Sequence, residues 1–98
     1  MANYMDIVIT CGVVSEDGGD YENIAVVEPV DANSQAEAIT AGALLAAQHG
    51  FDGLLQGIRL TTKPTPDLVD GEVFLEGGID ALVKLAEERN TAQLTVTM

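Results

Sequence analysis

His49 and Cys11 are the residues of this 98-residue sequence whose side chains most often carry acid–base or nucleophilic chemistry. His49, the only histidine, falls in the last turn of a predicted helix, where a donor side chain satisfies terminal carbonyls. A catalytic role for His49 would require a nucleophile and an orienting acid close to it in space, and the sequence indicates neither. Cys11 lies in a predicted strand, on its apolar face, with no basic neighbour in sequence to lower the thiol pKa. We therefore interpret both as structural residues.

Two further segments contain residues of the types that bind ions. Residues 16–22 carry the carboxylates of Glu16, Asp17, Asp20 and Glu22, but they lack the alternating ligands and closing glutamate of an EF-hand loop. The Glu76-Gly77-Gly78 segment has no lysine, and its glutamate would repel a phosphate. We interpret both segments as turns, and we expect no catalytic residue, metal site or cofactor.

The formal net charge of −12 is the strongest feature of the composition, because 16 acidic residues face only Arg59, Lys63, Lys84 and Arg89. Direct binding to nucleic acid is not expected, since that affinity depends on basic side chains that displace counterions. Anionic membranes are not expected partners for the same reason. The charge suits a basic partner, calcium, or solubility, including solubility in high salt.

Size and composition favour one globular domain over residues 1–98. The chain is 47% hydrophobic but only 4% aromatic, which predicts an aliphatic core. No apolar run is long enough to span a membrane. The single cysteine and the absence of a basic-then-apolar start favour a cytoplasmic, reducing compartment.

A helix over residues 34–51 is the clearest structural signal. Ser34 and Glu37 fit a capping box, in which Glu37 returns to the amide of Ser34, and Gly50 with Phe51 fits a left-handed helix end. One apolar side, predicted to pack on the core, contains Ile39, Gly42, Ala43 and Ala46, flanked by Ala36 and Ala47. A second apolar flank contains Ala38, Ala41 and Leu45, and Leu44 falls among the polar residues opposite the packing side. This wide apolar arc forms either ordinary exposed surface or a docking face for a second copy or a partner.

Alternating apolar residues predict strands over residues 4–14, 22–32, 54–63 and 91–98. A second helix is predicted over residues 79–90. Residues 66–76 are compatible with either a short strand at 72–75 or a helical turn. Pro29 requires a sheet edge or a bulge. The predicted fold is α+β, a two-layer sandwich with a mostly antiparallel sheet of four or five strands and both helices on one face, in the order β-β-α-β-(β)-α-β.

Two functional hypotheses follow. The first is a small acidic interaction protein without catalytic activity, either self-associating or docking as an inhibitor on a basic, nucleic-acid-binding partner. Its interaction residues would be Ala41, Leu44, Leu45, Glu16, Asp17, Asp20 and Glu22. The lysine-poor, alanine- and valine-rich composition would also fit an accessory protein of a phage or mobile element, although no family motif supports this. The alternative is a small enzyme or ligand binder whose site forms at an oligomer interface.

Overall fold

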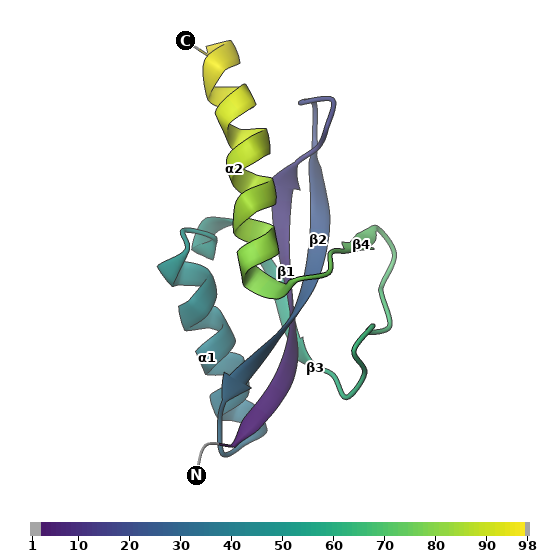
Figure 1. The fold of residues 1–98 in the computed structure, drawn as a ribbon, viewed down its shortest axis with the longest axis vertical. Coiled ribbons are helices and arrows are strands. Elements are labelled where there is room, and N and C mark those ends of the chain that lie inside the picture. The colour runs from purple at the N-terminus through teal and green to yellow at the C-terminus, as the bar shows by residue number, and fades with distance from the viewer. Residues whose placement is uncertain (1–2, 98) are drawn as a thin grey trace.

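The computed structural model describes the backbone of residues 3–97 and the side chains of residues 3–89. Four strands form one sheet in the order β3-β1-β2-β4, and two helices pack on one of its faces (Figure 1). β1 pairs antiparallel with β2 and β3, whereas β4 runs parallel to β2. The predicted α+β class is confirmed. The elements are β1 (Tyr4–Val14), β2 (Tyr21–Asp31), α1 (Gln35–Gln48), a 3-10 turn (Asp52–Leu54), β3 (Leu55–Leu60), β4 (Glu72–Phe74) and α2 (Gly78–Thr97).

β1 is the central strand, and both of its faces are buried from Ile7 to Val14. The face toward the helices forms the core with residues of β2, α1 and α2, and it carries Ile7, Ile9, Cys11 and Val13. On the opposite face Val8 and Thr10 are also buried. A sheet packed on one face only would leave these two residues in solvent. The second face must therefore have a cover of its own.

That cover is the segment 61–71, here called the strap, which joins β3 to β4. Because β3 and β4 are the two edges of the sheet, the strap must cross a whole face, and it takes the face opposite the helices (Figure 1). Pro66 in its middle is buried. Residues 72–74 form the short strand that the sequence left open.

The ends of α1 follow the prediction closely. The Ser34 hydroxyl accepts a hydrogen bond from the Glu37 amide at 3.2 Å, while the Glu37 carboxylate accepts one from Asn33 at 2.8 Å. The prediction that the Ser34 amide donates to Glu37 is therefore wrong by one residue, because the donor is the amide of Asn33. At the other end Gly50 has a φ of +81°. The Phe51 amide donates to the carbonyl of Ala46 at 2.8 Å, which closes the helix as a Schellman motif.

The packing face of α1 differs from the predicted one by a rotation about the helix axis. The buried residues are Ala38, Gly42 and Ala46, whereas Ala43 is exposed and Ile39 is half-buried. Gly42 sets this orientation, because a Cβ built there would meet Ile7 of β1 and would lie 3.2 Å from Ile58 of β3. The helix therefore turns its smallest residue toward the point where its backbone comes nearest the sheet.

α2 continues through Thr97, so the predicted strand over residues 91–98 is wrong where the structure describes it; Met98 lies outside the described residues. The sequence after Gly78 contains neither glycine nor proline, and Asn90 alone does not end a helix. The alternation of apolar and polar residues over 91–98 is therefore a weaker signal for a strand than the absence of a helix-terminating residue is for a continued helix. The sheet accordingly has four strands.

Two glutamates of β2 fix α2 on the sheet. The Glu28 carboxylate accepts a hydrogen bond from the Ile79 amide at 2.9 Å, at the helix end where the dipole favours negative charge. The Glu22 carboxylate pairs with Arg89 at 2.9 Å, and the same guanidinium donates to the carbonyl of Val14. Both ends of the packed part of α2 are therefore held by polar contacts to the β1–β2 hairpin.

Pro29 confirms the expectation of a sheet edge. β4 pairs with β2 only along residues 23–25. Within the described residues, the part of β2 that contains Pro29 therefore has a strand partner on one side alone. A residue without an amide proton is tolerated at such a position.

Replacing Gly42 by alanine tests the close approach of α1. Helix propensity alone predicts a gain of about 1 kcal/mol, whereas overpacking a filled core costs about 1–3 kcal/mol. Because the new Cβ meets both Ile7 and Ile58, we expect Gly42→Ala to lower the free energy of unfolding by about 1 kcal/mol, measured by urea denaturation. A more stable variant would show that the helix can move away from the sheet without loss.

Candidate interaction surfaces

The three α1 residues predicted to form a docking face do not share one exposed surface. Leu44 has 59% of its surface exposed. Ala41 and Leu45 are half-buried and pack against the core. Of these three residues, only Leu44 therefore offers an exposed apolar side chain to a partner.

The acidic residues between β1 and β2 have different roles in the structure. Asp17 accepts hydrogen bonds from the Ser15 hydroxyl and the Gly19 amide, and these bonds lower the pKa of its carboxyl group. Glu22 is bound to Arg89. Within the described residues, Glu16 and Asp20 make no side-chain hydrogen bond and are exposed. Asp17 thus stabilises the turn and Glu22 links the hairpin to α2, whereas the exposed carboxylates of Glu16 and Asp20 are not used in this way among the described residues.

His49 and Cys11 occupy the positions that the sequence predicted. His49 is the exposed C-cap residue of α1, but its backbone amide, rather than its imidazole, donates to the carbonyls of Leu45 and Ala46. Cys11 is buried in the core, and burial raises its thiol pKa to about 11. The core location of Cys11 is confirmed.

The most extensive polar network lies on the outer face of the sheet, around Glu72. Arg59 donates two hydrogen bonds to the two Glu72 carboxylate oxygens, at 2.9 and 2.7 Å. The Thr10 hydroxyl donates to the same carboxylate at 2.9 Å, and the Val69 amide at 3.1 Å. Arg59 also donates to the Asp67 carbonyl at 2.8 Å. Because Arg59 belongs to β3 and Glu72 to β4, their ion pair joins the two edge strands and fixes the strap between them.

Hydrogen bonding outweighs the cost of burial in this ion pair. The Glu72 side chain is 5% exposed and the Arg59 side chain 35%. The bonds from Arg59 lower the pKa of the Glu72 carboxyl group from 4.5 to about 2, against the opposing effect of burial. The same pairing raises the pKa of Arg59. Glu72 is therefore ionised across the whole range in which most proteins are folded.

This network is not among the features predicted from the sequence, although two weak signals in the sequence point to it. Thr10 is the one polar side chain in residues 7–14, which are otherwise apolar residues and glycine, and Arg59 alternates with Ile58 and Leu60. Each indicates a polar feature on a face opposite the core. Neither signal names Glu72 as the partner, because the pairing depends on the path of the strap.

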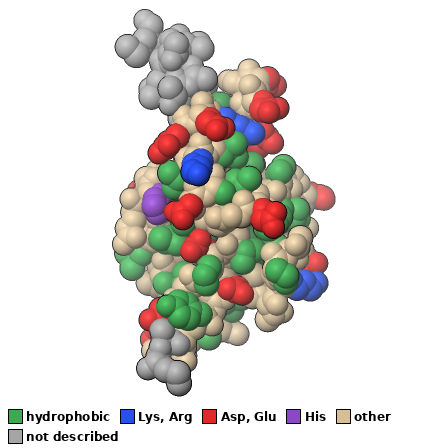
Figure 2. Space-filling view, viewed as in Figure 1, with side chains coloured by type: hydrophobic (Ala, Val, Ile, Leu, Met, Phe, Trp, Pro, Cys, Tyr) green, Lys and Arg blue, Asp and Glu red, His purple; other side chains and the backbone are tan. Residues whose placement is uncertain are grey.

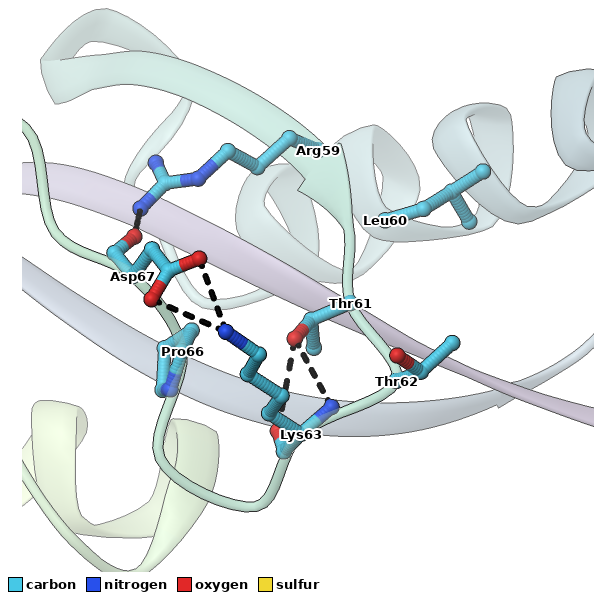
Figure 3. Close-up of a pocket in the computed structure, with 7 residues that line it drawn as sticks. All are labelled: Arg59, Leu60, Thr61, Thr62, Lys63, Pro66 and Asp67. Carbon is cyan, nitrogen blue, oxygen red and sulfur yellow. Dashed lines mark hydrogen bonds and ion pairs between the residues drawn. The ribbon is translucent and has the colours of Figure 1, made fainter.

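A hollow of about 320 Å³ lies where the strap leaves β3, and it includes both Arg59 and Lys63 (Figure 3). Lys63 binds both oxygens of the Asp67 carboxylate, at 3.1 and 3.0 Å. The Thr61 hydroxyl accepts a hydrogen bond from the Lys63 amide at 3.1 Å. Both cationic groups are thus turned toward Asp67 and Glu72 and already have anionic or carbonyl partners.

A second hollow, here called the acidic groove, has a volume of about 470 Å³ and lies between β2, the end of β4 and the start of α2. Its carboxylates are those of Asp6, Glu28, Glu76 and Asp80. Glu28 caps α2, whereas the other three are exposed. Apolar residues also line the groove, namely Val27, Pro29, Pro64, Phe74 and Leu75. The groove thus combines negative charge with apolar walls.

The basic side chains are used mainly within the molecule. Arg59, Lys63 and Arg89 each form an ion pair. Lys84 is the one basic residue for which no ion pair is recorded among the described side chains. In contrast, acidic side chains are spread over the face of the molecule that Figure 2 shows, with few basic groups between them. The negative charge that reaches solvent is therefore largely uncompensated.

The described residues contain neither a cluster of metal-ligating side chains nor a membrane-spanning helix. Among them, no group of three or more His, Cys, Asp or Glu side chains is placed to hold one metal ion. No helix in the described part of the chain is both long and apolar enough to cross a membrane.

Replacing Glu72 by glutamine removes the charge and keeps the shape. Breaking a largely buried ion pair of this kind costs about 2 kcal/mol at neutral pH. The folded-state pKa lies below the unfolded one, so the stabilisation is present above pH 4.5 and is lost as the pH falls toward about 2. The stability difference between wild type and Glu72→Gln should therefore shrink across that interval.

Urea denaturation at several pH values measures this difference. Glu16→Gln, which changes an exposed glutamate in the same way, is the matched control and should leave stability within about 0.5 kcal/mol of wild type. A Glu72→Gln deficit that stays constant between pH 4.5 and about 2 would contradict the assigned pKa.

Comparison of this chain with protein-family models, with curated proteins and with solved structures gave no match.

Proposed function

We propose that this chain is a non-catalytic, acidic interaction protein that docks on a basic surface of a protein partner. The observation that carries the proposal is that most of the basic side chains already form ion pairs within the molecule. Three of the four basic side chains are bound to carboxylates of the same molecule. A basic partner therefore meets exposed acids with little competing positive charge.

The acidic groove supplies the place for such a partner. Lysine and arginine side chains have apolar stems and charged heads. The stem of such a side chain fits against Pro29 and Leu75, and its head meets the carboxylates of Glu76 and Asp80. A groove with both kinds of wall suits a basic side chain better than it suits a free cation.

The strap and β4 carry further exposed apolar side chains. Leu68 and Val69 of the strap and Val73 of β4 are all exposed. Asp67 and Asp70 are exposed in the same segment. Apolar contacts supply affinity, while the surrounding charges steer association and set specificity.

A nucleic-acid-binding protein is the partner class that this chemistry favours. Such proteins carry grouped lysine and arginine side chains that contact phosphates. An acidic protein that occupies the same side chains acts as an inhibitor of that contact. Cytoplasmic localisation and an accessory role in a phage or mobile element belong to the same proposal, and the alternative of an enzyme or ligand binder stays a prediction.

An arginine-rich peptide of about nine residues, labelled for fluorescence anisotropy, tests the docking site. We expect binding that weakens as salt rises from about 50 to about 500 mM, because the contacts are electrostatic. The double variant Glu76→Gln/Asp80→Asn, which neutralises the groove, should raise the dissociation constant about tenfold, since each lost contact costs about 0.5–1 kcal/mol.

The matched control is Glu87→Gln/Glu88→Gln, which makes the same change in net charge at exposed residues further along α2. Its affinity for the peptide should stay within about twofold of wild type. Equal weakening by the two double variants would show that the peptide responds to overall charge and would contradict a docking site in the groove.

A further inference from the structure

The acidic residues are distributed very unevenly along the sequence. Of the 16 acidic residues, only Asp52 lies between Ala38 and Pro66. This stretch contains most of α1, the 3-10 turn, all of β3 and the start of the strap. One continuous part of a strongly acidic chain is therefore nearly free of negative charge.

The acid-poor stretch also forms one continuous region in space, because α1 packs on β3. Gly42 of α1 approaches Ile58 of β3. Gln35, at the start of the helix, lines the same surface hollow as Leu60 and Thr61, and Asp6 of β1 is the one acidic residue of that hollow. Residues four apart lie on one row of a helix, so Ile39 and Ala43 follow Gln35 along the side next to β3. Ile39 and Ala43 together with the outer edge of β3 are here called the neutral flank.

The outer edge of β3 offers unpaired backbone groups. The Thr61 amide donates to the carbonyl of Asp6 at 3.0 Å, so the hydrogen-bonding groups of Thr61 point toward β1. In an antiparallel pair this direction alternates from residue to residue. The amides and carbonyls of Ile58 and Leu60 therefore point away from β1, on a side where the described structure has no further strand.

Features that usually protect an edge strand are scarce along this part of β3. Proteins block such edges with charges, prolines or bulges. The one irregularity of β3 lies near its start, at the register shift opposite Thr10 and Cys11, and leaves residues 57–60 regular. The charged head of Arg59 is bound to Glu72 on the outer face, so it does not shield the edge.

We propose that the neutral flank pairs with the same flank of a second copy of this chain. The two β3 strands run antiparallel and join the sheets into one, and the α1 helices meet through Ile39 and Ala43. Because Ala43 is small, the two helix backbones can approach closely. This inference goes beyond the proposed function and does not depend on it, since a basic partner binds elsewhere on the molecule.

Charge is the reason for choosing a second copy as the occupant. Two chains that each carry a net charge of −12 repel one another wherever their acids face across an interface. At about 0.15 M salt the repulsion falls off over about 8 Å. An approach through the neutral flank keeps most acids outside that range, whereas a basic partner gains more by binding the acidic surfaces.

Two neighbouring residues of α1 give a matched test by sedimentation velocity. Both Ala43 and Leu44 are exposed, but Ala43 lies on the row beside β3, whereas Leu44 lies nearly opposite the buried Gly42, on the side of the helix that faces solvent. We expect wild type to dimerise, and more tightly at about 500 mM than at about 50 mM salt. Ala43→Glu should raise the dimer dissociation constant about tenfold or more, because two like charges then face each other across the symmetry axis.

Leu44→Glu should leave the dimer dissociation constant within about twofold of wild type. Circular dichroism shows whether each variant keeps its helices. A wild type that stays monomeric at millimolar concentration, or a Leu44→Glu variant that dissociates as readily as Ala43→Glu, would overturn the proposal.

Amide hydrogen exchange gives a second readout that a dimer of another geometry would not reproduce. The amides of Ile58 and Leu60 should become protected as the protein concentration rises, since they form the bonds between the two copies. The Thr61 amide, which is bound to Asp6 within one chain, should be equally protected at every concentration. Exchange at Ile58 and Leu60 that does not respond to concentration would exclude pairing through β3.

Discussion

The scarcity of positive charge is the constraint on which this structure depends. Sixteen acidic residues share four basic ones, so the position of each cation decides which carboxylates are neutralised. Arg59 fixes the strap through Glu72, Arg89 fixes α2 through Glu22, and Lys63 binds Asp67 within the strap. The cations thus hold together segments that are distant in sequence or lack regular structure. The remaining acids are left to the surface.

These ion pairs differ greatly in how much they contribute to the stability of the fold. The Lys63–Asp67 pair is well exposed on both sides and, as a surface pair, contributes about 0–1 kcal/mol. The Arg59–Glu72 pair is shielded and carries three further hydrogen bonds, two of them to Glu72 from Thr10 and Val69. Replacing one partner there leaves a polar group under the strap without its bonds. The outer face of the sheet is therefore closed by polar contacts, whereas the face toward the helices is closed by apolar packing.

Local signals in the sequence were sufficient for the elements whose ends have their own chemistry. β1 has the predicted bounds, and α1 has Ser34 as its N-cap and the left-handed Gly50 directly after its C-cap. The end of α2 was not predictable in this way, because two-residue alternation after Asn90 competes with a helix that has no stop signal. Long-range features were also missed. The rotation of α1 depends on Ile7 and Ile58 below Gly42, and the Arg59–Glu72 pair depends on the path of the strap.

The same reasoning explains why the candidate surfaces were only partly predictable. Composition alone indicates an acidic protein, but it does not show which carboxylates are free. The structure binds Asp17 within the turn and Glu22 to Arg89 of α2, and it leaves Glu76 and Asp80 exposed at the groove. It also places α1 beside β3, so that two stretches with few acids become one flank. The account therefore assigns two surfaces of opposite character to one small domain.

Backbone amide NMR shifts test this division most directly, because one spectrum reports on both surfaces. Titration with an arginine-rich peptide should shift amides around the acidic groove, such as those of Glu76 and Asp80. Dilution of the free protein should instead shift amides of the neutral flank, such as those of Ala43, Ile58 and Leu60. If both changes moved the same amides, the two proposed surfaces would be one, and the account would be wrong.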